Sequence, residues 1–142
     1  MGNTCVKKYS KQSLTAISFL VFFEEGAFTK ILRKYFLYDR TLLTGLSRCG
    51  WESLKLFFQE AVPEEDAVPG AVIAIQSFGD FLGFNSHLHV LASDGCFYGR
   101  GTFRVAPRFE TKELEKIFRH KVFNMLILRG KIKEELVSML MS

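Results

Sequence analysis

Two of the three histidines in the sequence, His87 and His89, lie two positions apart in an apolar segment, FNSHLHVLASDG (84–95). In a β-strand, side chains two positions apart point to the same face, with Cα atoms about 6.5–7 Å apart. Two imidazoles at this spacing can converge on one metal ion, each nitrogen about 2.1 Å from it. A structural histidine pair with satisfied hydrogen bonds gives the same pattern, so the spacing alone leaves both interpretations open.

A third metal ligand is expected from a neighbouring strand on the same face. The segment 71–78 reads as a strand, and we expect it to form a hairpin with 87–93 across the turn-rich connection 79–86. In this hairpin Gln76 lies nearly opposite His87, and Asp80 is the alternative third ligand. Two nitrogens, an amide or carboxylate oxygen and waters suit a divalent ion such as Mg²⁺, Mn²⁺ or Zn²⁺.

Two arginines that follow the histidine segment are candidate DNA-binding residues. Arg100 and Arg104 share strand parity within a predicted strand at 96–105, so both could face a phosphate backbone beside a metal. A solvated strand face is the alternative. The net charge of +4 fits a polyanionic partner without requiring one.

Other chemistries have less support. No serine lies in a Gly-x-Ser-x-Gly elbow, and no glycine-rich loop fits a phosphate cradle. The cysteines Cys5, Cys49 and Cys96 form no Cys-x-x-Cys pair, so they indicate free thiols in a reducing, cytoplasmic environment rather than a zinc ribbon or a disulfide framework. His120, between Arg119 and Lys121, is predicted to be a surface residue of a helix.

The rest of the chain predicts the sheet that must position the histidines. With 142 residues, 48% of them hydrophobic, and 15 phenylalanines, we expect one domain with an aromatic-rich core. Strands are predicted at 17–23, 71–78, 87–93 and 96–105, with Asp94-Gly95 as the turn between the last two. Adjacent hairpins of this kind give a small antiparallel sheet.

Apolar residues at three- and four-residue spacing predict the helices. The first covers roughly 39–60, with Asp39 as its N-cap and a core-facing stripe of Leu43, Leu46, Gly50, Leu54, Phe57 and Ala61. The second opens at Thr111 and ends at Gly130. A third begins near Ile132, and the sequence then stops without a polar cap, so we expect an incomplete domain. The predicted fold class is α+β, an antiparallel sheet flanked by helices.

The N-terminal segment contains a short apolar run, LTAISFLVFF (14–23), after Lys7, Lys8 and Lys11. Acidic residues follow the run directly, without a small-residue cleavage site, and the run is about half as long as a membrane span requires. We therefore expect a strand here, loose residues before it, and no membrane partner.

Three linked blocks of the sequence closely resemble the two-tyrosine HUH transposases of rolling-circle insertion sequences. They are RKYFLYDRTLLTGLSRCGWESLK (33–55), EDAVPGAVIAIQSFGDFLGFNSHLHVLASDGCF (65–97) and FRHKVFNMLILRGKIKEELVSMLMS (118–142). HUH denotes histidine, hydrophobic residue, histidine, which here is His87-Leu88-His89. On this resemblance, residues 30–142 form a partial, HUH-endonuclease-like domain, and residues 1–29 form a divergent N-terminal segment.

The resemblance implies an enzyme that cuts and joins single-stranded DNA at insertion-sequence ends. The histidine pair and a third polar ligand, for which Gln76 and Asp80 are the candidates, would hold a divalent ion, Mg²⁺ or Mn²⁺, that polarises the scissile phosphate. A tyrosine then attacks the scissile phosphate and forms a 5′-phosphotyrosine link, and the broken phosphodiester bond leaves a free 3′-hydroxyl.

The sequence departs from the family in three places. Asn85-Ser86 replaces the usual proline before the first histidine, and the family's cysteine-rich N-terminal segment has no match. The catalytic tyrosines of the family lie on a downstream helix, so we expect the nucleophile beyond residue 142 and transfer the role to none of the four tyrosines, Tyr9, Tyr35, Tyr38 and Tyr98.

The leading hypothesis is therefore a transposase fragment that carries the metal ligands and does not cleave DNA alone. Self-association through core surface exposed at the end of the chain is also expected. The alternatives are a non-catalytic single-stranded-DNA-binding protein and a small metal-binding or structural protein.

Overall fold

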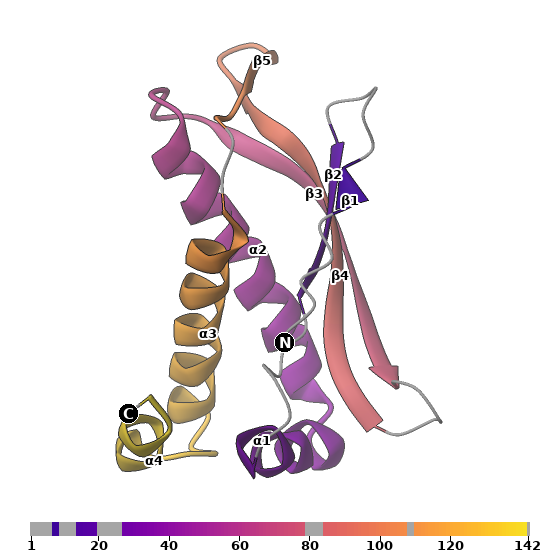
Figure 1. The fold of residues 1–142 in the computed structure, drawn as a ribbon, viewed down its shortest axis with the longest axis vertical. Helices are drawn as coiled ribbons and strands as arrows, with labels where there is room; N and C mark the ends of the chain where they lie inside the picture. Colours follow the sequence, from indigo (N-terminus) through magenta and orange to yellow (C-terminus); the bar gives the residue numbers. More distant parts are fainter. Residues whose placement is uncertain (1–6, 9–13, 20–26, 79–83, 108–109, 142) are drawn as a thin grey trace.

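The computed structural model describes residues 7–8, 14–19, 27–78, 84–107 and 110–141 (Figure 1). Along the chain the elements are β1 (Lys7–Lys8), β2 (Leu14–Phe19), α1 (Ala27–Tyr38), α2 (Thr41–Ala61), β3 (Val68–Phe78), β4 (Phe84–Tyr98), β5 (Thr102–Val105), α3 (Thr111–Leu128) and α4 (Glu134–Met141). The predicted α+β class, with an antiparallel sheet and flanking helices, is confirmed.

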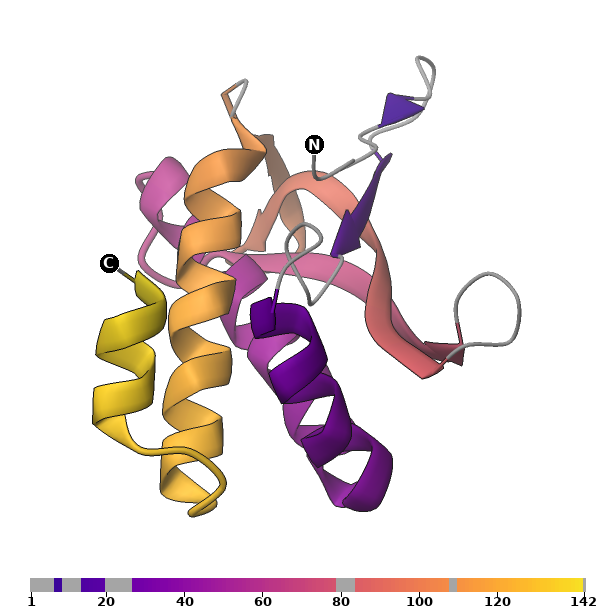
Figure 2. The same ribbon diagram turned by 60° about the horizontal axis from the view of Figure 1, so that its bottom comes forward.

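The sheet has the strand order β1-β2-β4-β3, and β5 pairs with the C-terminal part of β4. Every pairing is antiparallel. β1 and β2 come from the predicted N-terminal segment, so that segment contributes to the same sheet. Helices α2 and α3 lie side by side on one face of the sheet, while α1 and α4 lie near the end where α2 begins (Figures 1 and 2).

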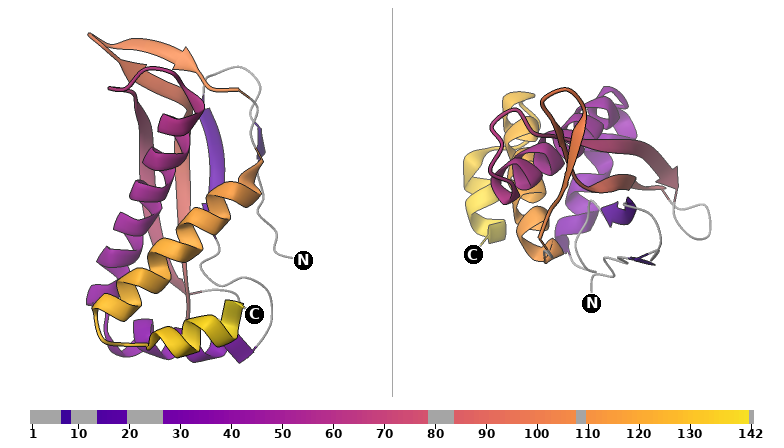
Figure 3. Two further views of the ribbon diagram at one scale, coloured as in Figure 1. Left: turned by 90° about the vertical axis from the view of Figure 1, so that its left-hand side faces the viewer. Right: turned by 90° about the horizontal axis from the view of Figure 1, so that it is seen from above.

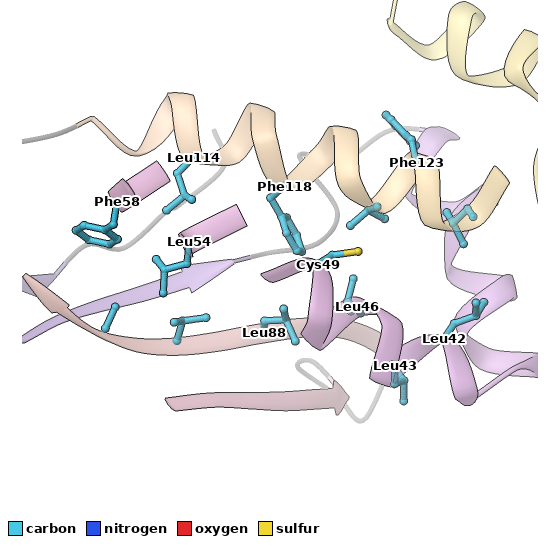
Figure 4. Close-up of a cluster of buried hydrophobic side chains, with 14 of the residues drawn as sticks. Leu42, Leu43, Leu46, Cys49, Leu54, Phe58, Leu88, Leu114, Phe118 and Phe123 are labelled. Atoms are coloured by element: carbon cyan, nitrogen blue, oxygen red, sulfur yellow. The ribbon is translucent and has the colours of Figure 1, made fainter. Parts of the chain in front are cut away.

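The core forms where α2 and α3 meet the inner face of the sheet. On β4, Leu88 points toward both helices, and Phe118 of α3 points toward it from the other side (Figure 4). Gly50 lets α2 lie close to β4, because a Cβ at this position would lie 2.7 Å from Leu88 Cδ1. The predicted stripe on α2 is largely correct, since Leu43, Leu46, Gly50 and Leu54 are buried.

The end of α3 follows from a glycine, as predicted. Gly130 has a φ of 69°, in the left-handed region that favours glycine. Its N–H donates to the carbonyl of Ile127, and the N–H of Lys131 donates to the carbonyl of Leu126, both at 2.9 Å. These two bonds form a Schellman motif and satisfy carbonyls that the helix leaves unpaired. α4 then follows, as the spacing after Ile132 predicts.

The start of α2 differs from the prediction by two residues. Asp39 is not the N-cap, because α2 begins at Thr41 and Arg40 precedes it without a side-chain cap. The carboxylate of Asp39 instead accepts hydrogen bonds from the backbone N–H of Thr41 at 3.1 Å and from its hydroxyl at 2.5 Å. It also pairs with Lys131 at 3.0 Å, and these contacts lower the pKa of Asp39.

Two further elements differ from the sequence reasoning. α1 is a separate helix that the apolar spacing did not identify, although Leu32 and Phe36 on it are buried. The strand predicted at 17–23 is β2, and it runs over Leu14–Phe19, while 20–23 lie outside the described residues. Within the predicted loose region, Lys7 and Lys8 pair with Ala16 and Thr15.

The predicted turn at Asp94-Gly95 is wrong. β4 continues through both residues to Tyr98, and the chain turns afterwards, where Gly99 and Gly101 have φ values of 55° and 98°. At Gly95 a side chain is excluded for another reason, since a Cβ would overlap the carbonyl oxygen of Arg104 on β5. The glycine therefore permits close approach of two strands rather than a turn.

Asp94-Gly95 lies in an irregularity of β4. Ala71 pairs with Ala92 and Pro69 with Cys96, so β4 has two more residues than β3 over this interval. The buried hydroxyl of Ser93 bridges this irregularity, because it accepts the N–H of Gly70 at 2.9 Å and donates to the carbonyl of Gly95 at 2.7 Å. One side chain thus satisfies backbone groups where the ladder is interrupted.

Candidate metal site on the outer face of the sheet

The predicted histidine motif lies in the N-terminal half of β4, paired with β3. The register places Gln76 opposite His87, as predicted, and it places Ala74 opposite His89 and Val72 opposite Leu91. Because side chains alternate along a strand, Leu88 and Val90 face the helices, whereas His89 and Leu91 face away from them. We call this second surface the outer face. In Figure 3 the helices α2 and α3 lie on the opposite side of the sheet.

Gln76 and His89 meet on the outer face, and both are exposed. Nε2 of His89 lies 2.8 Å from Oε1 of Gln76. With a proton on Nε2, the imidazole donates a hydrogen bond to the amide oxygen. Two ligand atoms at about 2.1 Å from one ion and at right angles to each other lie about 3 Å apart. The observed separation is that of an ordinary hydrogen bond, and it also matches the spacing of two neighbouring ligands of an octahedral ion.

For His87, the other histidine of the motif, the structure describes only the backbone. Its register position opposite Gln76 is described, its side chain is not, and Asp80 lies outside the described residues. Within the part of the chain that the structure describes, no three His, Cys, Asp or Glu side chains gather as a metal cluster. The described donors are thus one imidazole nitrogen and one amide oxygen, a set that suits a divalent ion.

A contact outside the sheet lies next to Gln76. Nη2 of Arg40 donates to Oγ of Ser77 at 3.4 Å, which joins the link between α1 and α2 to the end of β3. Sequence reasoning missed this contact, because 37 residues separate the two partners and no local pattern connects them.

The structure does not bring the two predicted DNA-binding arginines beside His89. Nine positions of β4 separate His89 from Tyr98, which corresponds to about 30 Å along a strand. Arg100 lies in the turn after Tyr98, and Arg104 lies on β5. The prediction that they share strand parity is wrong, because the turn occurs after Tyr98 and not at Asp94-Gly95.

Arg104 is already paired within the chain. Its guanidinium forms an ion pair with Glu64, and it lies over the ring of Tyr98, 5.8 Å from the centroid. The Glu64 carboxylate raises the pKa of Arg104. Arg100 is exposed in the turn, so of the two arginines it is the one that a polyanion can reach without displacing Glu64.

The tyrosines whose side chains the structure describes lie on α1 or at the C-terminal end of β4. Tyr98 is the last residue of β4, and not part of the following strand as predicted, and it packs partly buried against the core. Tyr35 also packs against the core, and Tyr38 is exposed at the end of α1. Tyr9 lies outside the described residues.

The two described cysteines are free thiols and His120 is a surface residue of a helix, as predicted, while Cys5 lies outside the described residues. Cys49 and Cys96 are free and buried. Burial raises the pKa of the Cys49 thiol to about 11, so the thiolate nucleophile is suppressed at neutral pH. His120 is exposed on α3, with its Nε2 3.2 Å from Nδ2 of Asn124.

Comparison of the chain with protein families, with curated proteins and with solved structures gave no match. Among the described residues, no helix has the length and apolar character needed to cross a membrane.

Proposed function

We propose that this chain is the metal-binding part of a transposase that cuts and joins single-stranded DNA, with His87, His89 and Gln76 as ligands of a divalent ion. The observation that carries the proposal is the contact of 2.8 Å between Nε2 of His89 and Oε1 of Gln76, on a strand pair whose register sets His87 opposite Gln76. Two histidines and a third polar residue are the ligand set that the HUH resemblance implies. The HUH-endonuclease-like fold and the role of residues 30–142 belong to the same proposal.

The residues of the site share one task in this proposal, which is to hold the metal ion. When bound, a Mg²⁺ or Mn²⁺ ion supplies a Lewis acid for the scissile phosphate. His89 and Gln76 fix the position of that ion from two adjacent strands, so the rigidity of the hairpin sets the position. Their exposure leaves the outer face open to a nucleic-acid strand. The attacking role is assigned to none of the three described tyrosines. The resemblance implies a nucleophile on a helix downstream of the histidine motif, whereas Tyr35 and Tyr38 precede the motif on α1 and Tyr98 lies on β4.

Metal binding is the first test. We expect Mn²⁺ to raise the melting temperature of the wild-type chain and the effect to be lost in His89→Ala and His87→Ala. Gln76→Glu should strengthen Mn²⁺ binding, since a carboxylate replaces a neutral amide at the same position. His120→Ala is the matched control, because it removes an exposed imidazole from α3. Absence of a Mn²⁺ effect in the wild type, or an equal loss in His120→Ala, rejects the metal site.

DNA binding is the second test, measured by fluorescence anisotropy with single-stranded and duplex oligonucleotides over a range of salt. Single strands should bind more tightly, with log K falling linearly with log salt. Arg100→Ala should reduce the slope by about 0.7, the value for one phosphate contact on a single strand. Lys116→Ala is the control, because Lys116 is an exposed cation paired with Glu113 on α3. Metal binding without DNA binding would instead indicate a small metal-binding protein.

A further inference from the structure

β3 forms one border of the sheet along its whole length. Among the described strands it pairs only with β4, whereas β2 and β5 occupy the other side of β4 (Figures 1 and 3). Pro69, near the start of β3, agrees with a border position, because proline has no N–H to donate to a second neighbour. The remaining residues of this border strand are free of proline.

The border strand lacks the charges that usually protect a sheet edge. From Val68 to Phe78 its sequence is VPGAVIAIQSF, without a single charged residue. Val72 is 68% exposed, and Ile75 and Val68 are 40% and 39% exposed. A long, apolar, uncharged edge is a template for pairing with another strand. Protection by proline is confined to one end, so the segment after Pro69 is the part that can pair.

The charge pattern distinguishes between two kinds of partner. A nucleic acid needs cations for its phosphates, and β3 supplies none. A second copy of this chain presents the same uncharged, apolar β3, so two copies can pair these strands without burying a charge on either side. The strand is therefore suited to its own copy rather than to a polyanion.

We propose that two copies of this chain associate through β3, each pairing antiparallel with the β3 of the other about a two-fold axis. The two sheets then form one continuous sheet, with the paired segment beginning after Pro69. The apolar side chains of Val72 and Ile75 gain cross-strand neighbours from the second copy. Since the axis is perpendicular to the sheet, both outer faces lie on the same side of the dimer. This association does not depend on metal or DNA binding.

The test compares one substitution on the border strand with the same substitution on the central strand. Val72→Lys places a charge on β3, and Leu91→Lys places it directly opposite on β4, on the same outer face. Sedimentation equilibrium should show a dimer for the wild-type chain. We expect the dissociation constant to rise at least tenfold in Val72→Lys and to change less than twofold in Leu91→Lys. The assay contains no divalent metal, which separates it from the test of the metal site.

Hydrogen exchange gives a second measurement, independent of any variant. Raising the protein concentration should slow exchange at alternate amides of β3 after Pro69, while the amides of β5 are unchanged. A wild-type chain that stays monomeric, or one that forms open-ended assemblies, overturns the proposal. An equal loss of association in both lysine variants also overturns it, because that result indicates docking through the outer face rather than the edge.

Discussion

The two faces of β4 differ in almost every physical property, although their residues alternate along one strand. Leu88, Val90 and Ala92 on the inner face are at most 2% exposed, while Leu91 between them is 44% exposed and His89 is also exposed. The inner residues hold α2 and α3 against the sheet. The outer residues have few such constraints, so they are available for chemistry and for contact with partners. Substitutions on the inner face of this strand should therefore lower the stability of the fold, and substitutions on the outer face should change binding and leave the stability nearly unchanged.

The largest expected effect is on the inner face. Leu88→Ala should lower the free energy of unfolding by about 3 kcal/mol, since it removes a fully buried side chain beneath Gly50 and Phe118 and leaves a cavity. Urea denaturation followed by circular dichroism measures the change. The control is Leu91→Ala, the same substitution three positions along on the outer face, which should lower the stability by less than about 1 kcal/mol. Equal losses in the two variants would show that the faces are not distinct.

The second effect concerns the irregularity that ends the regular part of β4. Gly95→Ala should lower the free energy of unfolding by about 2–3 kcal/mol, because its Cβ would overlap the backbone of Arg104 and must displace β5. Gly99→Ala is the matched control. Its site has a φ of 55° with no atom near the added Cβ, so only the strain of the left-handed backbone remains, about 1 kcal/mol. If Gly99→Ala is the more damaging change, the close approach of β4 and β5 at Gly95 is not the constraint.

Gly95 also shows where sequence reasoning ends. The hairpin of β3 and β4, with Gln76 opposite His87, was predictable because the apolar run and the turn-rich connection are local signals. The role of Asp94-Gly95 was not predictable in this way, because the same dipeptide serves a turn or an irregular strand. The position of Arg104 on β5 decides between the two, and that is a tertiary contact.

The surroundings of the predicted site residues show the same limit. Strand alternation was enough to place His89 on the face opposite Leu88, yet the pairing of Arg104 with Glu64 spans 40 residues and has no local signal. α1 was missed for a related reason. Its buried positions, Leu32 and Phe36, form too short a stripe to separate it from α2 by periodicity.

The third effect is smaller and tests the polar bridge at the same irregularity. Ser93→Ala should lower the free energy of unfolding by about 1–2 kcal/mol, because the N–H of Gly70 and the carbonyl of Gly95 lose their common partner. Ser138→Ala, at an exposed position of α4, should change it by less than about 0.5 kcal/mol. Faster exchange of the Gly70 amide in Ser93→Ala would identify the lost hydrogen bond directly. An unchanged exchange rate and unchanged stability would mean that water replaces the hydroxyl there.

The smallest expected change in stability is that of His89→Ala on the outer face. Comparison with Leu88→Ala on the inner face distinguishes a loss of metal binding from a loss of folding stability. His89→Ala should alter the free energy of unfolding by less than about 0.5 kcal/mol without metal, since His89 is exposed and its hydrogen bond to Gln76 lies at the surface. With Mn²⁺ at a hundred times its dissociation constant, the wild-type chain should gain about 2.7 kcal/mol, and the variant should gain none. Leu88→Ala, by contrast, should lose stability in both conditions yet keep the gain from Mn²⁺, measured at a temperature where the variant is folded. A large loss in metal-free His89→Ala would mean that the imidazole supports the fold, and that His89 and Gln76 form a structural pair rather than a metal site.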